Sequence, residues 1–197
     1  MHNRRSDEYR RSWVDGLTAW IDRLPFPSAV FYMAVYLVFV LLLHLVEWLN
    51  GTLAWGAPSA IAFYNAIWFP LVLGFIHPLD HVATAAMGRF APLLGDRAAE
   101  ADSLLYRMTT LPAGATLALY LGAATVLVIV GYLDPGFVVF VMPEGELHPI
   151  AWALATLCSA VSYAMAPVLL LHAVRQLRLV SKAYELVAEV NVFEQRR

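Results

Sequence analysis

Residues 24–46 read LPFPSAVFYMAVYLVFVLLLHLV and contain no Asp, Glu, Lys or Arg. Three further charge-free windows follow it, at 48–79, 108–133 and 147–174. An α-helix needs about 20 apolar residues to cross the hydrocarbon core of a bilayer, and every window is longer than that. The sequence therefore predicts an all-α integral membrane protein, a bundle of four transmembrane helices with spans at about 28–49, 57–77, 113–133 and 150–174.

The composition agrees with a membrane protein and excludes several other classes. Of the 197 residues, 60% are hydrophobic and 14% are charged, whereas a soluble domain has about a quarter charged residues. This excludes a disordered chain, a soluble α/β enzyme and a disulfide-stapled secreted module. A transmembrane β-barrel is disfavoured because its strands alternate in polarity over about 10 residues. The single cysteine, Cys158, lies in the fourth window and has no intramolecular partner.

The basic residues give the expected orientation in the membrane. They occur only before the first span, between the second and third spans, and after the fourth: Arg4, Arg5, Arg10, Arg11, Arg23, Arg89, Arg97, Arg107, Arg175, Arg178, Lys182, Arg196 and Arg197. Loops rich in Lys and Arg stay in the cytoplasm. We therefore expect both termini to be cytoplasmic, in a plasma membrane of the bacterial inner-membrane type.

Three segments divide the chain. Residues 1–24 are predicted to form an amphipathic helix on the cytoplasmic leaflet, because Tyr9, Trp13, Leu17, Trp20 and Leu24 recur at helical spacing. Residues 25–175 hold the four spans, with interfacial helices expected in the connector 78–111, interrupted near Gly95. Residues 176–197 are predicted to continue span four as a cytoplasmic helix.

That C-terminal helix presents two apolar rows. Leu177, Val180, Tyr184 and Val187 step by three and four residues, like the seam of a short coiled coil. Leu179, Ala183 and Leu186 belong to the second row. A helix with two such rows is expected to have partners on more than one side: its own connector helices, and a second copy or another protein.

Small residues recur every four positions in the last two spans: Gly114, Ala118 and Gly122 in span three, and Ala151, Ala155 and Ser159 in span four. Such stripes let membrane helices approach closely. We expect these two stripes to pack against each other, with a homo-oligomer face as the alternative.

Candidate chemistry lies with the histidines and nearby carboxylates. His77, Asp80 and His81 fall at i, i+3 and i+4, and His172 is expected at the same depth, so these four are candidate ligands for Zn, Fe or Mn. At the opposite end, His44, Glu47 and His148 form a candidate outer polar cluster. Two histidine groups at two depths are also compatible with haem b. The ordinary alternative is that these side chains hydrogen-bond to backbone or lipid headgroups in the interface.

Three function classes follow from these features. The leading hypothesis is a non-catalytic membrane module, a sensor or an assembly subunit, coupled to cytoplasmic partners by its C-terminal helix. A metal- or haem-binding redox protein is the second. An oligomeric small channel or transporter is the third, suggested by Asn65, the Pro70 kink and the acidic outer loop 134–149. Enzyme motifs such as GxSxG, HExxH and CxxC are absent, and the scattered basic residues do not suggest nucleic-acid binding.

Overall fold

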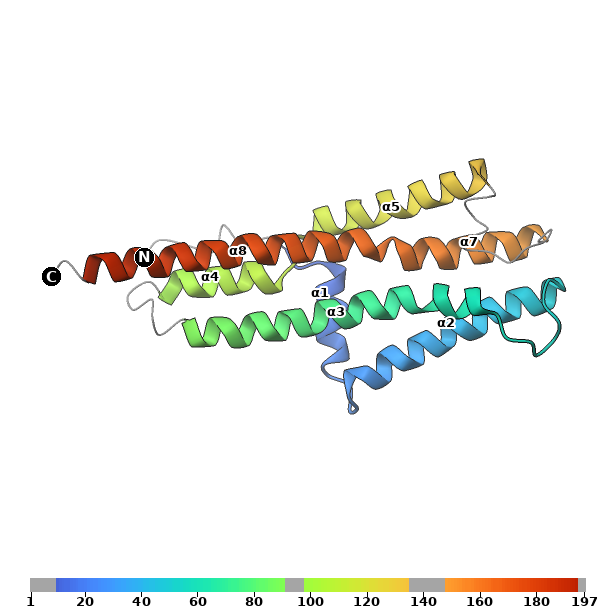
Figure 1. The fold of residues 1–197 in the computed structure, drawn as a ribbon, viewed down its shortest axis with the longest axis horizontal. Helices are drawn as coiled ribbons and strands as arrows, with labels where there is room; N and C mark the ends of the chain where they lie inside the picture. Colours follow the sequence, from blue (N-terminus) through green and yellow to red (C-terminus); the bar gives the residue numbers. More distant parts are fainter. Residues whose placement is uncertain (1–9, 91–97, 135–147, 195–197) are drawn as a thin grey trace.

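The computed structural model describes residues 10–90, 98–134 and 148–194, with backbone alone at 98, 99 and 186–194. These residues form helices and no strands. The helices long and apolar enough to cross a membrane are α2 (Ser28–Asn50), α3 (Ala60–Phe90), α5 (Ala113–Leu133) and the pair α7 (Pro149–Tyr163) and α8 (Met165–Glu194) (Figure 1). The prediction of an all-α chain with four such helices is confirmed.

Helix α1 (Trp13–Ile21) crosses the bundle and packs against α3 (Figure 1). Ser12 and Asp15 form a capping box at its N-terminus, in which each side chain accepts the backbone N–H of the other residue. Val14 and Ile21 are buried, and Trp13 and Leu17 pack against a core cluster of Val72, Leu73, Ile76, Met165 and Val168. Part of the apolar face of this helix therefore contacts protein, whereas Trp20 is 49% exposed. Tyr9 lies outside the described residues.

Helix α3 is longer than the sequence predicted, which is the main correction to the expected boundaries. It continues through Pro70 and Pro78 to Phe90, so the first part of the expected connector is the end of this helix. At 1.5 Å per residue, its 31 residues extend roughly 46 Å, well beyond the roughly 30 Å of a hydrocarbon core. Gly95, the expected interruption, lies outside the described residues.

Three helices form an extension beyond the bundle: the C-terminal end of α3, the whole of α4 (Ala98–Thr109), and α8 (Figure 1). Its core consists of Ala83 and Met87 of α3, Ala101 and Met108 of α4, and Leu179 and Ala183 of α8. The three alanines let the helices approach closely. Helix α8 thus belongs to both halves of the molecule, since Met165 and Val168 lie in the bundle core.

The pair α7 and α8 is interrupted at a single residue, Ala164. Pro167 has no N–H to donate to the carbonyl of Tyr163 four residues earlier, which is the residue at which α7 ends. Beyond Pro167, α8 runs without interruption to Glu194.

Helix α5 does not pack through its small-residue stripe. Gly114, Ala118 and Gly122 are all exposed, and a Cβ added at either glycine would meet nothing within 4 Å. Thr116 is buried, and it lies two residues, or about 200° of helix rotation, from Gly114. The helix contacts α7 through large side chains, such as Tyr120, which donates to the Val161 carbonyl at 3.3 Å.

The stripe of α7 faces a different neighbour. Ala155 and Ser159 are buried and Ala151 is half-buried, and Ala151 and Ala155 pack with Val46 of α2. The expectation that the stripes of spans three and four pack against each other is therefore wrong. Aromatic side chains bridge α5 and α7, and the small residues of α7 accommodate α2.

Candidate functional site

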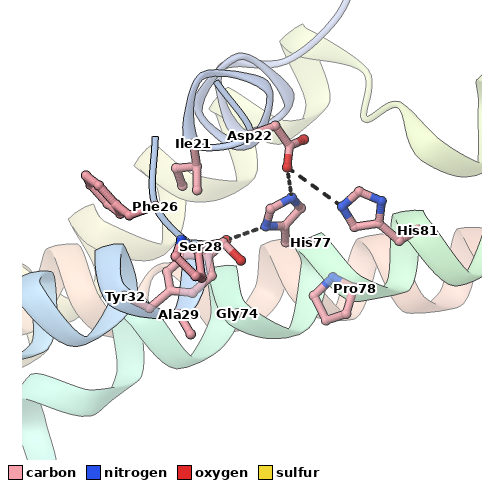
Figure 2. A pocket seen from close by; sticks show the side chains of 11 residues that line it. Ile21, Asp22, Phe26, Ser28, Ala29, Tyr32, Gly74, His77, Pro78 and His81 are labelled. Carbon is pink, nitrogen blue, oxygen red and sulfur yellow. Dashed lines mark hydrogen bonds and ion pairs between the residues drawn. The ribbon is translucent and has the colours of Figure 1, made fainter. Parts of the chain in front are cut away.

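Two histidines of α3 converge on one carboxylate from another part of the chain (Figure 2). His77 and His81 are one helical turn apart, and their ring centroids are 4.8 Å apart. Both face Asp22, the C-cap residue of α1. His77 Nε2 lies 2.7 Å and His81 Nε2 lies 3.8 Å from the same oxygen, Asp22 Oδ1. We call Asp22, His77 and His81 the inner triad.

Tyr32 of α2 fixes the ring of His77 from its other side. The Tyr32 hydroxyl lies 2.8 Å from His77 Nδ1, so the ring is held between a hydroxyl and a carboxylate (Figure 2). The His77 side chain is only 6% exposed, whereas those of Asp22 and His81 are 48% and 66% exposed. The inner triad therefore combines one rigidly held imidazole with two groups that solvent reaches.

Two hollows meet at the inner triad. One, of about 430 Å³, lies where α1 turns into α2 and is lined also by Phe26, Ala29, Tyr32 and Gly74 (Figure 2). The other, of about 200 Å³, is more polar and is lined also by Arg11, Asp15, Thr18 and Asp80. All three triad residues line both hollows, so a small ligand or ion entering from either one reaches them.

Asp80 and His172 form a second, separate pair. Asp80 Oδ1 lies 3.1 Å from His172 Nε2 of α8, within ion-pair distance although the two groups are not aligned as a hydrogen bond. Gln176 Nε2 donates to Asp80 Oδ1 at 3.4 Å and to the Met108 carbonyl at 3.2 Å. The four predicted metal ligands thus divide into His77 and His81 facing α1, and Asp80 and His172 joining α3 to α8.

Helical geometry explains this division. Asp80 and His81 are adjacent in sequence, so their side chains differ by about 100° around the helix axis. One can therefore face α8 while the other faces α1. Among the described residues, the group with three or more potential metal ligands close together is the inner triad.

Asp15 links α1 to the start of α5. Its carboxylate accepts the Leu111 backbone N–H at 3.0 and 3.2 Å, in addition to capping α1. Burial raises the pKa of the Asp15 carboxyl above its ordinary value of 3.8, although hydrogen bonds from Ser12 and Leu111 oppose the shift. This carboxylate is a structural tether in the wall of the smaller hollow.

Only part of the predicted outer polar cluster is brought together. His44 and Glu47 are both buried and both bind Ser59: its backbone N–H donates to His44 Nε2 at 3.0 Å, and its hydroxyl donates to Glu47 Oε1 at 3.0 Å. His148 is exposed and instead caps α7, while its backbone N–H donates to Asn50 at 2.7 Å. His44 and Glu47 therefore anchor the start of α3 to α2.

The polar residue and the proline expected inside span two are both buried in α3. Asn65 accepts a hydrogen bond from the Tyr163 hydroxyl of α7, and Pro70 lies within the unbroken helix. Asn65 thus joins two helices. Residues 135–147, most of the segment predicted to be an acidic outer loop, lie outside the described residues.

The two apolar rows of α8 differ in environment. Leu179 and Ala183 are buried in the three-helix extension, whereas Leu177, Val180 and Tyr184 are 68%, 37% and 60% exposed. We call Leu177, Val180 and Tyr184 the exposed apolar row; the side chain of Val187 lies outside the described residues. The ring of Phe90 lies beside this row, with its centroid 5.6 Å from that of Tyr184.

Sequence reasoning missed Asp22 and Tyr32, the two residues that complete the surroundings of His77. Both are remote from His77 in sequence, by 55 and 45 residues. Asp22 lies near the end of the predicted amphipathic segment 1–24, and nothing in the spacing there connects it to His77. Comparison of the chain with protein-family models, curated proteins and solved structures finds no match.

Proposed function

We propose that this protein is a non-catalytic membrane module, a sensor or an assembly subunit, whose four-helix bundle is coupled to cytoplasmic partners through α8. The observation that carries the proposal is the exposed apolar row on a helix that starts in the bundle core. Met165 and Val168 are fully buried, and Leu177 is 68% exposed only nine residues after Val168.

The position of the exposed apolar row supports a protein partner over lipid. From Val174, the last residue of the charge-free window, to Tyr184 is about 15 Å along the helix. Arg175, Arg178 and Lys182 lie in this stretch, and Glu185 directly follows it. Charged side chains are costly inside a bilayer, so this part of α8 belongs in water or at the headgroups. Exposed apolar side chains there mark an interaction surface.

The connection between the two ends of α8 supports coupling. His172 and Gln176 contact Asp80 of α3 where the helix leaves the bundle, and Gln176 also contacts α4. A shift of α3 relative to α8 would therefore change the packing of the extension. A movement within the bundle would in this way be transmitted along α8 to the exposed apolar row.

Site-specific photo-crosslinking in native membranes tests the proposal. A photo-reactive amino acid is placed at position 177 or 184, and at 178 or 182 as matched controls on the polar side of the same helix. We expect adducts at 177 and 184 that exceed those at the control positions several-fold, and mass spectrometry distinguishes a second copy from another protein. Equal or absent adducts at all four positions would contradict the proposal.

A further inference from the structure

We propose that Asp22, His77 and His81 bind a divalent transition-metal ion of the zinc class, with one coordination position left open. The proposal rests on the geometry of the inner triad, and it is independent of the partner surface on α8. One potential ligand atom from each of the three residues lies within 4.8 Å of the others.

The spacing of these atoms is close to the spacing of ligands around a metal ion. Ligands about 2.0–2.2 Å from a tetrahedral ion are roughly 3.4 Å from one another. Asp22 Oδ1 is 2.7 Å from one histidine nitrogen and 3.8 Å from the other, so the observed distances lie on either side of that value. The side chains of Asp22 and His81 are 48% and 66% exposed, so both have room to rotate toward that spacing when an ion binds.

The donor types select the class of metal. Two imidazole nitrogens and one carboxylate oxygen suit Zn²⁺, Fe²⁺ or Mn²⁺, and they disfavour Ca²⁺ and Mg²⁺, which prefer oxygen ligands alone.

Tyr32 gives the site the outer support that metal-binding histidines need. In the structure His77 Nε2 donates to Asp22 Oδ1 at 2.7 Å, and Nδ1 accepts from the Tyr32 hydroxyl at 2.8 Å. When Nε2 binds an ion instead, the ring proton lies on Nδ1 and is donated to the Tyr32 hydroxyl oxygen, which keeps the ring in the same orientation. The ring is buried and held on both sides, so little conformational freedom is lost when the ion binds.

The two hollows supply access and the open position. Three protein ligands leave a fourth tetrahedral position, as in metal sites that hold a water or a small ligand. The hollow of about 430 Å³ borders all three ligands and is large enough for such a group. Binding would also join α1 to α3, because Asp22 caps α1 and both histidines belong to α3.

Metal titration of the full chain tests the proposal directly. Tag-free protein in mild detergent is stripped with chelator and titrated with Co²⁺, whose visible absorption reports coordination, and then with competing Zn²⁺. We expect one ion per chain. His81→Ala should weaken binding at least tenfold without lowering the unfolding temperature, because His81 is exposed, and Tyr32→Phe should weaken it about tenfold.

His148→Ala, an exposed histidine on α7, is the matched control and should bind as the wild type does. Loss of binding in His172→Gln equal to that in His81→Ala would assign a different ligand set and overturn the proposal. Absence of saturable binding, or wild-type affinity in the folded His81→Ala variant, would also overturn it.

Discussion

Asp80 of α3 lies 3.1 Å from His172 of α8, measured from Oδ1 to Nε2, at the level where α8 passes from the bundle into the three-helix extension. His172 is 2% exposed, and Asp80 is the charged group that faces its Nε2. Gln176 joins the same carboxylate to α4 through the Met108 carbonyl. This pair therefore fixes how α3, α4 and α8 sit relative to one another.

Replacing Asp80 by Ala should destabilise the protein by about 1–3 kcal/mol, because the buried His172 then loses the carboxylate that faces it and Gln176 loses one of its two acceptors. Thermal unfolding in detergent measures the loss. Asp102→Asn, at an exposed position of α4, serves as the control and should change the unfolding temperature little. An equal change in unfolding temperature for the two substitutions would show that the contacts of Asp80 do not stabilise the fold.

His77→Ala should lower the free energy of unfolding by about 1–3 kcal/mol, since it removes the hydrogen bonds to Tyr32 and Asp22 from a buried position. His81→Ala, one turn further along α3, should have almost no effect because that side chain is 66% exposed. Hydrogen exchange of α1 should increase only in the His77 variant. Similar exchange in both variants would argue against Asp22 and His77 holding α1 in place.

Asp15 predicts a pH dependence with a definite sign. Burial raises the pKa of its carboxyl in the folded protein above the ordinary value of 3.8, so folding favours the protonated form. The resulting stabilisation is complete below pH 3.8 and is lost as the pH rises through the folded pKa. Asp15→Asn does not ionise and escapes this loss.

The unfolding temperature of Asp15→Asn minus that of the wild type should therefore increase with pH across this window and then become constant. Thermal unfolding at a series of pH values measures the difference. Asp102→Asn corrects for the removal of a charge at an exposed site. A difference that decreases with pH would mean that the hydrogen bonds from Ser12 and Leu111 outweigh burial.

Leucine substitutions distinguish the two small-residue stripes. Ala155→Leu should cost about 1–3 kcal/mol, because Ala155 is 3% exposed and packs against Val46 of α2. Ala118→Leu is the same substitution at an exposed position of α5 and should be nearly neutral in the isolated chain. Unfolding in detergent compares the two. A larger loss in Ala118→Leu would place the α5 stripe in a packed interface.

The four apolar helices were predictable because charge-free stretches of sufficient length have few alternatives to a transmembrane helix. The length of α3 was not predictable, because Pro78 and Asp80 have the features of a helix end. Contacts of α3 with α4 and α8 instead stabilise the helix beyond the apolar window. The packing partner of the Gly114 stripe was equally beyond prediction, since small residues permit close approach without specifying the neighbour.

The candidate site was predictable only as far as local periodicity reaches. Spacing placed His77 and His81 on one face of a helix, which the structure shows. It also grouped Asp80 with them, although Asp80 turns to α8. Asp22 and Tyr32 come from other elements, and no spacing rule connects residues that are 55 and 45 positions away from His77.

We propose that the exposed apolar row of α8 lies in the cytoplasm. Single cysteines at Ser181→Cys on α8 and Ala54→Cys in the loop between α2 and α3, each with Cys158 replaced by Ala, test it with a membrane-impermeant thiol reagent on intact cells. Both positions are exposed. We expect Ala54→Cys to be labelled in intact cells and Ser181→Cys to be labelled only after permeabilisation. Labelling of Ser181→Cys from outside intact cells would contradict it.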